Sequence, residues 1–236
     1  MAVYRINGQR HHDPIDNAPI EEFDMNIALI GASGFIGSAL REEALQRGHQ
    51  VTALVSQPDK LQPADNLTIV KSDVQNTEQL SEQLKGFDAV LSAFSGHAKE
   101  NVREYYLQGV QSIIQATKEA GVPRLLIVGG AGSLHVNADT LLIDTPNFPA
   151  EYQGTARGAL DALALLRNES ELNWTMLSPA AEIFPGKRTG SFQLGKDDLV
   201  VDADGNSRIS VQDYAVALIN ELEQPQHEGE RFTLGY

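Results

Sequence analysis

Cysteine is absent from the sequence. The chain therefore cannot form a disulfide, bind a metal through thiolates or use a thiolate as a nucleophile. Basic residues are scarce, because 18 Lys and Arg face 32 Asp and Glu and leave a net charge of −14. A surface this acidic repels the phosphate backbone of nucleic acids, so we do not expect a nucleic acid as a partner.

Long apolar runs are also missing. No stretch approaches the roughly 20 apolar residues that a membrane-spanning helix needs, and the first residues lack the charged-then-apolar pattern of a signal peptide. We therefore expect a cytoplasmic protein that does not enter a membrane. With 236 residues, of which 42% are hydrophobic, the chain is long enough for one α/β domain with a buried core.

The first 24 residues differ in character from the rest of the chain. They are polar, contain Pro14 and Pro19, and show neither strand nor helix periodicity. We interpret residues 1–24 as an extension that precedes a single domain over residues 25–236. His11 and His12 lie in this extension without a third ligand at a helical spacing, so we predict no metal site.

From Met25 onward, short apolar runs alternate with amphipathic stretches. We expect strands at residues 26–30, 50–55, 67–70, 88–92, 124–128 and 174–177. We expect helices at residues 35–47, 77–85, 100–120 and 154–168, and a further helix that begins near Ser210. The apolar runs are nearly continuous, which is typical of strands that are covered on both faces. The pattern predicts an α/β fold with a doubly wound parallel sheet, with Tyr106 and Trp174 in its core and residues 231–236 as an edge strand.

Three glycines lie at the end of the first expected strand. In "IALIGASGFIGSAL", Gly31, Gly34 and Gly37 are three residues apart, where the apolar run gives way to a helix. In this context the first glycine allows a tight turn, the second lets a pyrophosphate approach the backbone, and the third lets the helix pack closely on the strand. The helix N-terminus adds N–H donors and a positive dipole end. The pattern therefore favours a bound dinucleotide over an ordinary glycine-rich turn, with Ser33, Phe35 and Ile36 in the same turn.

The spacing G-x-x-G-x-x-G in "GASGFIG" resembles the short-chain dehydrogenase superfamily. It is most similar to the atypical NAD(P)H-binding branch that includes NmrA-like proteins and the flavin and biliverdin reductases. Further stretches resemble a bacterial group named NADH-flavin reductases: "VTALVSQPDKL", "VGGAGSL", "DTPNFP", "LSPAAEIFPGKRTGSFQLG" and "DADGNSRISVQDYAVAL". The resemblance covers residues 25–236. It implies a Rossmann fold with a small C-terminal region that covers the substrate, and hydride transfer from NAD(P)H to a flavin such as FMN or FAD, or to a similar flat acceptor. The sequence leaves open whether the protein is a monomer or a homodimer.

The end of the second strand bears on the choice between NAD and NADP. An acidic residue there would bind the ribose 2′-hydroxyl of NAD, whereas a basic residue would bind the 2′-phosphate of NADP. This chain has Val55, Ser56 and Gln57, and related proteins often carry Arg where Ser56 stands. Because the acid is missing, and because Ser33, Ser56 and Lys60 could hold a phosphate, we favour NADP over NAD.

The resemblance assigns further cofactor contacts to the turns after later strands. Asp73 and Val74 stand where the family contacts adenine, although Asp73 could instead stabilise its own turn or cap the next helix. The backbone of Ser92, Ala93 and Phe94 stands beside the cofactor ribose. After the sixth expected strand, Ser178 and Pro179 stand where the family positions the nicotinamide.

In the classical short-chain enzymes, a Tyr, a Lys four residues later and a Ser after the fifth strand form the proton-donating site. Here the Ser position offers Ser133, and the Tyr position offers Tyr152, but Ala156 replaces the Lys. This absence argues against ketone reduction, which needs a positioned acid, and is compatible with reduction of a flavin or bilin, which delocalises the incoming electrons.

Three alternatives stay open at this point. Ser133 and His135 could orient a substrate, and Tyr152 or His135 could serve as an unrecognised acid in a reductase or epimerase. Phe184 and Phe192 could stack on a flat ring or belong to the core. The chain could also be a non-catalytic sensor of the NmrA type, which binds NAD(P) and reports its redox state to a protein partner.

Overall fold

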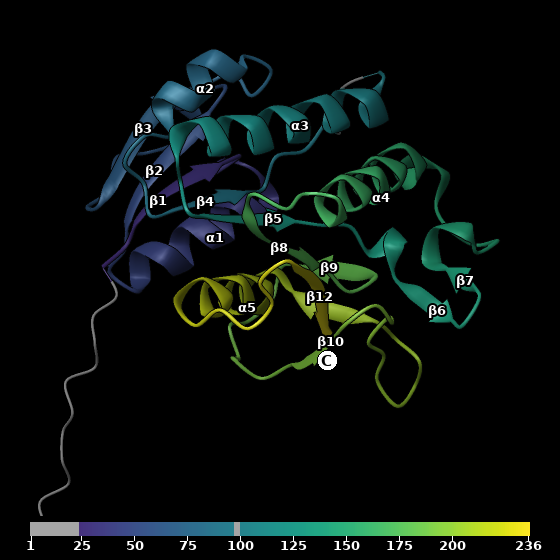
Figure 1. The fold of residues 1–236 in the computed structure, drawn as a ribbon. Coiled ribbons are helices and arrows are strands. Elements are labelled where there is room, and N and C mark those ends of the chain that lie inside the picture. The colour runs from purple at the N-terminus through teal and green to yellow at the C-terminus, as the bar shows by residue number, and fades with distance from the viewer. Residues whose placement is uncertain (1–23, 97–99) are drawn as a thin grey trace, which may run out of the picture.

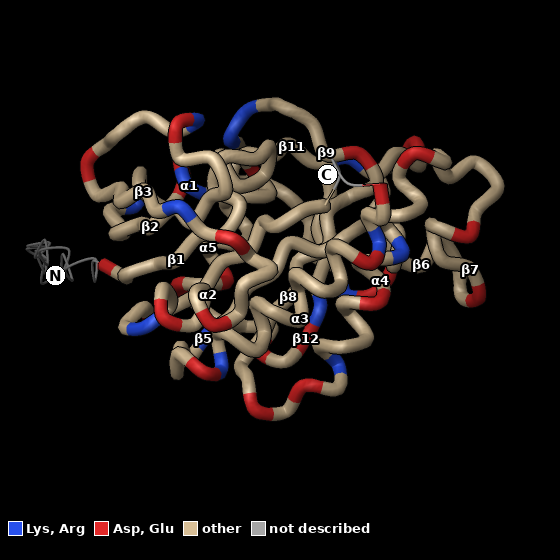
Figure 2. Tube along the Cα trace, turned by 90° about the horizontal axis from the view of Figure 1, so that it is seen from above, with Lys and Arg blue, Asp and Glu red and all other residues tan. Residues whose placement is uncertain are grey.

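The computed structural model describes residues 24–96 and 100–236 (Figure 1). Apart from Asp24, the expected N-terminal extension with its two histidines lies outside the described residues. Within them, no helix is both long and apolar enough to cross a membrane. Acidic and basic residues are dispersed along the chain over many loops and helices (Figure 2).

The centre of the molecule is an eight-stranded sheet in the order β10-β12-β8-β5-β4-β1-β2-β3. Its strands are β1 (Asn26–Ile30), β2 (Gln50–Val55), β3 (Leu67–Lys71), β4 (Ala89–Ser92), β5 (Arg124–Val128), β8 (Asn173–Ser178), β10 (Gln193–Gly195) and β12 (Glu230–Gly235). All neighbouring strands run parallel except β10, which pairs antiparallel with β12. This arrangement confirms the predicted α/β fold with a doubly wound, mostly parallel sheet.

Helices cover both faces of the sheet, as Figure 1 shows. The helices are α1 (Phe35–Gln46), α2 (Thr77–Gln83), α3 (Val102–Ala120), α4 (Gln153–Arg167) and α5 (Val211–Glu223). The apolar sides of α1 and α5 form one half of the core with alternate strand residues, and α2, α3 and α4 form the other half. Tyr106 and Trp174 are buried in the second half, as predicted.

Short elements lie at the C-terminal side of the sheet. They are β6 (His135–Asn137) with β7 (Thr140–Leu141), and β9 (Glu182–Phe184) with β11 (Arg208–Ser210), which form two small two-stranded sheets. The long strands and helices agree with the sequence predictions to within two residues at each end.

One prediction about the sheet was wrong. The closing strand, β12, is not an edge strand, because it pairs with β8 on one side and with β10 on the other. The edge belongs to β10, whose three residues are too few to show a period in the sequence.

Candidate dinucleotide site

The sheet changes direction between β1 and β4. From β1 the chain proceeds outward through α1 to β2 and β3, and β4 then returns to the other side of β1. The helix that follows β1 lies on one face of the sheet, and the helix that follows β4 lies on the other. The carboxyl ends of β1 and β4 therefore border the crevice in which folds of this class bind ligands.

Gly31, which follows β1, contacts the loop that follows β4. Its backbone has a φ of +78°, and its N–H donates to the carbonyl oxygen of Leu54 at 3.1 Å. A Cβ atom at Gly31 would lie 2.6 Å from the carbonyl oxygen of Ala93, which leaves no room for a side chain. The structure thus brings together two predicted cofactor segments, the glycine turn and the loop after β4.

The contacts at Gly37 and Gly34 differ from those at Gly31. A Cβ at Gly37 would lie 2.0 Å from the carbonyl oxygen of Gly31, so glycine here lets α1 approach the turn. A Cβ at Gly34 would meet only the carbonyl oxygen of Gly31, at 3.4 Å, which is an ordinary contact. The protein itself therefore does not require glycine at 34, and the side where its Cβ would stand is open to a ligand.

The start of α1 provides donors beside this open side. Gly34 is the N-cap residue, no side chain caps the helix, and no acidic residue lies in the first turn. The N–H groups of Phe35, Ile36 and Gly37 consequently lack the carboxylate or hydroxyl partner that many helix ends have. Such an end binds an anion such as a pyrophosphate.

The three residues predicted to hold a 2′-phosphate, Ser33, Ser56 and Lys60, are all exposed. Ser33 belongs to the glycine turn, Ser56 follows β2 directly, and Lys60 ends a 3-10 turn over Pro58–Lys60. β1 and β2 are neighbours in the sheet, so these residues extend from adjacent strand ends.

The predicted adenine contacts follow β3. The Oδ1 atom of Asp73 accepts from the N–H of Gln75 at 3.0 Å, so this side chain stabilises its own turn. The cap of α2 is Asn76, which accepts from the N–H of Gln79. Val74 is half-buried and packs against the core on the α3 side.

The loop after β4 presents backbone to the crevice. The ring of Phe94 stacks on Tyr106 with centroids 5.9 Å apart, and a Cβ at Gly109 would lie 2.2 Å from that ring. The ring therefore packs against the core but remains partly exposed. Ser92 is buried, and its Oγ accepts weakly from the N–H of Phe94 at 3.4 Å.

A buried arginine on β12, which the sequence did not reveal, connects the 3-10 turn after β5 (Ala131–Ser133) with the end of β8. The Nη1 atom of Arg231 donates to Oγ of Ser133 at 3.1 Å and to Oγ of Ser178 at 3.4 Å. The hydroxyl of Ser133 donates to the carbonyl oxygen of Gly130 at 3.1 Å. Ser133 is 4% exposed, so its hydroxyl is engaged within the protein. Pro179, which follows Ser178, is also buried.

The other two candidate catalytic residues differ in their surroundings. The backbone N–H of His135 donates to the carbonyl oxygen of Asp197 at 2.8 Å, and the Asp197 carboxylate pairs with Arg231. Tyr152 is 54% exposed and immediately precedes α4. His135 opens β6, and its Nδ1 atom is buried without a hydrogen-bond partner in the described part of the chain. No hydrogen bond between described residues joins Tyr152, His135 and Ser133. Their assignment as proton donors therefore stays a prediction.

The position of the classical Lys is occupied by Ala156, and the next residue is Arg157. Ala156 is 9% exposed, and a Cβ at Gly132 would lie 2.9 Å from its methyl group. Arg157 pairs with Asp144, with 2.7 Å between Nη2 and Oδ1. Its guanidinium is therefore engaged away from Tyr152 by a neighbouring carboxylate.

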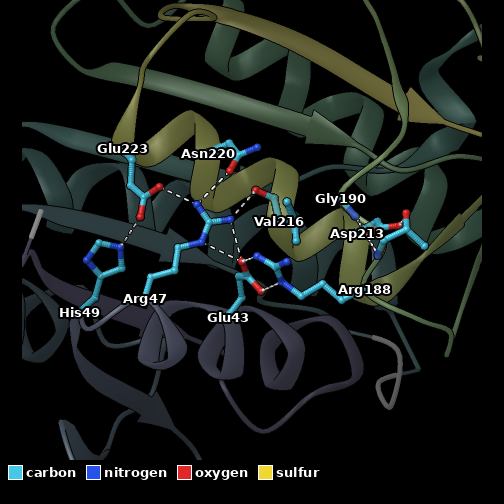
Figure 3. A network of polar contacts seen from close by, with 10 residues as sticks. Glu43, Arg47, His49, Arg188, Gly190, Asp213, Val216, Asn220 and Glu223 are labelled. Carbon is cyan, nitrogen blue, oxygen red and sulfur yellow. Dashed lines mark hydrogen bonds and ion pairs between the residues drawn. The ribbon is translucent and has the colours of Figure 1, made fainter. Parts of the chain in front are cut away.

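A network of ion pairs connects α1 with α5 and with the segment between β9 and β10 (Figure 3). Glu43 on α1 accepts from Arg47 at 2.7 Å and from Nε and Nη2 of Arg188, both at 2.8 Å. Burial alone would raise the pKa of the Glu43 carboxyl, but Arg188 and Arg47 outweigh it and lower this pKa. Arg47 also pairs with Glu223, whose carboxylate accepts a hydrogen bond from Nε2 of His49 at 3.0 Å.

Asp213, in the first turn of α5, binds the same segment between β9 and β10. It is fully buried and accepts from the N–H and hydroxyl of Thr189, the N–H of Gly190 and the hydroxyl of Tyr236, at 2.6 to 2.8 Å. Burial tends to raise the pKa of Asp213, and these four donors lower it below its usual value. The segment that carries Arg188 is thus anchored at both sides.

The two phenylalanines of the C-terminal region have packing contacts. Phe184 lies edge-on to Tyr236 with centroids 6.4 Å apart, and Arg208 lies 4.7 Å over its ring. Phe192 packs against the core of the α1 and α5 side. Both side chains therefore have partners within the protein.

Two hollows on the described surface lie elsewhere. One, of about 340 Å³, is bordered by α5, β10 and β12, and the other, of about 520 Å³, lies between α3 and α4. Neither includes the glycine turn. The free N–H groups at the start of α1 and the close glycine contacts lie instead at the glycine turn, between the ends of β1 and β4.

A family model described as NAD(P)H-binding matches residues 31–222. The chain belongs to this family. The match begins at Gly31 and ends in α5, so it contains the whole glycine turn and every predicted cofactor contact. It confirms the expected nicotinamide cofactor and the atypical short-chain dehydrogenase group.

Three relatives cover nearly the whole chain. The uncharacterized protein YwnB of Bacillus subtilis (strain 168) is 46% identical over 213 residues, which are 89% of this chain and 98% of YwnB. A crystal structure of a "putative epimerase" from Bacteroides thetaiotaomicron is 45% identical, with a TM-score of 0.84, and the match covers 90% of this chain and 97% of that one. A "putative NADH-flavin reductase" from Streptococcus pneumoniae TIGR4 is 38% identical, with a TM-score of 0.76 and coverage of 89% and 99%.

Proposed function

We propose that the protein is an NAD(P)H-dependent reductase that transfers a hydride to a flavin or a similar flat conjugated acceptor. The observation that carries the proposal is the open side at Gly34 beside the uncapped start of α1. No contact within the protein requires glycine at position 34. A dinucleotide pyrophosphate on the helix N–H groups would require it, because a side chain would occupy the space of the ligand.

The predicted contact residues follow the ends of β1, β2, β3, β4 and β8, which belong to one sheet. Gly31, Gly34 and Gly37, with Phe35 and Ile36, would hold the pyrophosphate. The other predicted contacts divide by strand end: Ser33, Ser56 and Lys60 for a 2′-phosphate, Asp73 and Val74 for adenine, Ser92, Ala93 and the Phe94 backbone for ribose, and Ser178 and Pro179 for nicotinamide. When bound, NAD(P)H supplies the hydride.

The surroundings of the acceptor position support a flat, conjugated substrate. Ala156 replaces the classical Lys, the Ser133 hydroxyl is engaged by Gly130 and Arg231, and Arg157 is paired with Asp144. A ketone would need a proton from a positioned acid, whereas a flavin spreads the incoming charge over its rings and can take its proton from water. The similarity to the Streptococcus protein named for flavin reduction agrees with this choice.

The test is the rate of NADPH oxidation, with NADH in parallel, by purified protein with excess FMN, after subtraction of the uncatalysed rate. Gly34→Ala is the matched variant with a blocked cofactor site, because a methyl group fits the protein there but would occupy the ligand side. We expect a saturable rate for the wild type, faster with NADPH, and a strongly reduced rate for Gly34→Ala.

Absence of any rate above background with either cofactor would refute free-flavin reduction. If the protein nevertheless bound NADP(H) and distinguished its oxidised from its reduced form, the sensor of the NmrA type would replace the reductase as the proposed function. The same purified sample serves both measurements.

A further inference from the structure

Arg41 on α1 places a guanidinium against the glycine turn. Its Nη1 atom donates to the carbonyl oxygen of Ala32 at 3.1 Å. Ala32 is fully buried and lies between Gly31 and Ser33, so the hydrogen bond is made to the backbone of the cofactor turn itself. The Arg41 side chain is only 16% exposed. A partly desolvated cation is therefore held at the predicted dinucleotide site.

The position of Arg41 on the helix determines which part of the site it faces. Successive residues of an α-helix differ by about 100°, so Arg41 and Glu43 are on opposite sides of α1. Glu43 faces α5 and the segment of Arg188. Arg41 consequently faces the other way, toward β2 and the outer strands, since α1 packs under β1 and β2. Its long side chain extends back toward the helix N-terminus.

That side of the turn is where the second strand ends. Ser56 follows β2, and Lys60 ends the next 3-10 turn. No acidic residue stands at Val55, Ser56 or Gln57 to bind a ribose hydroxyl. In this fold the end of the second strand selects between the 2′-hydroxyl of NAD and the 2′-phosphate of NADP.

The nearby carboxylates do not neutralise Arg41 effectively. Glu42 lies 3.6 Å from Nη2 of Arg41, but its side chain is 71% exposed. Water and salt screen such a pair, so it binds the guanidinium weakly. Asp59 is exposed beside Lys60. A phosphate, in contrast, would accept two parallel hydrogen bonds from the guanidinium, which suits Arg better than any other side chain.

We infer that Arg41 recognises the 2′-phosphate of NADP, together with Ser33, Ser56 and Lys60, and that it does so from α1 because no basic residue follows the second strand directly. The inference rests on the NAD(P) site of the proposed function and adds the residue that makes the site selective. The hydrogen bond to Ala32 orients the guanidinium, and its remaining N–H groups are the donors for the phosphate.

The test is the affinity for NADP⁺ and NAD⁺, measured by titration calorimetry on the wild type, Arg41→Gln and Arg41→Lys. We expect Arg41→Gln to raise the Kd for NADP⁺ by about tenfold or more and to change the Kd for NAD⁺ by less than about threefold. Arg41→Lys keeps the charge without the planar fork, so its Kd for NADP⁺ should fall between the two. Arg103→Gln is the control, because Arg103 is an exposed residue of α3 paired with Asp161.

The outcomes separate this inference from the proposed function. If the wild type binds both nucleotides and Arg41→Gln leaves their affinity ratio unchanged, the role of Arg41 is refuted while the cofactor site stands. An equal loss of both nucleotides would also refute it, since Arg41 would then only support the turn. If the wild type binds neither nucleotide, both proposals fail.

Discussion

Arg188 and Glu43 are 145 residues apart in sequence and form a two-point ion pair, with Nε and Nη2 of the arginine each 2.8 Å from a different carboxylate oxygen. Glu43 is 5% exposed, although it carries a charge. The pair joins the segment between β9 and β10 to α1, the helix that begins at the glycine turn. Two parts of the chain that the fold alone would leave independent are thereby fixed to each other.

Glu43→Gln should therefore destabilise the protein. The substitution keeps the size of the side chain but removes the charge that Arg188 and Arg47 share, and hydrogen bonds to charged groups contribute about 2 kcal/mol. We expect the free energy of unfolding to fall by about that amount in urea denaturation. Glu42→Gln, at the adjacent 71%-exposed position, should change it by less than about 0.5 kcal/mol. Equal effects of the two substitutions would contradict the structural role of Glu43.

The stability should also depend on pH in the acidic range. Burial opposes ionisation of Glu43 and Asp213, but their arginine, hydroxyl and backbone N–H partners outweigh it, and both folded-state pKa values lie below the unfolded ones. Their contribution is complete above the unfolded-state pKa values of about 4 and is lost as the pH falls through the lower folded values. Urea denaturation from pH 6 to pH 3 should show a steeper loss of stability for the wild type than for Glu43→Gln.

Substitutions of Gly37 and Gly34 should have different effects on stability and on cofactor binding. Gly37→Ala forces a methyl group to within 2.0 Å of a backbone oxygen, so we expect a loss of about 2 to 3 kcal/mol in unfolding free energy. Gly34→Ala meets its nearest atom at 3.4 Å and should cost about 1 kcal/mol or less, since alanine is a poorer N-cap than glycine. Its Kd for NADP⁺ should nevertheless rise at least about tenfold, because the methyl group occupies the ligand side. Thermal melting and calorimetry on the same samples measure the two effects, and unchanged NADP⁺ affinity in Gly34→Ala would contradict the cofactor site.

Tyr152→Phe tests whether the reaction needs a protein acid. If the acceptor is a flavin, we expect kcat with FMN to stay within about twofold of the wild type, since a positioned acid contributes about 100-fold or more where one is used. The profile of kcat against pH should then be the same for both proteins. A loss of two orders of magnitude would instead identify the exposed tyrosine as a proton donor and favour a carbonyl substrate.

Local signals in the sequence were sufficient for most of the sheet and for the glycine turn. The buried parallel strands are short apolar runs, and the bounds of β1, β2 and β5 follow directly from them. The turn could be recognised because two of its glycines have local requirements: Gly31 has a positive φ of +78°, and Gly37 approaches the backbone of Gly31. Such requirements leave a pattern that can be read without knowing the fold.

Contacts between distant residues left no such pattern. Glu43 and Arg47 are one helical turn apart, but nothing in the sequence connects them to Arg188. The same holds for Arg231, which lies 98 residues from Ser133 and occupies its hydroxyl. Chain position therefore indicated Ser133 correctly as the residue after the fifth strand but not the direction of its side chain. β12 was misplaced for a similar reason, because its outer neighbour is a three-residue strand.

Tyr236 has its hydroxyl between the carboxylate of Asp213, at 2.7 Å, and the N–H of Ser210, at 3.2 Å. Its own N–H donates to the carbonyl oxygen of Arg208 at 3.0 Å. The Tyr236 side chain thus reaches the carboxylate that also binds Thr189 and Gly190. A carboxypeptidase that trimmed this residue would remove one of the four donors to Asp213.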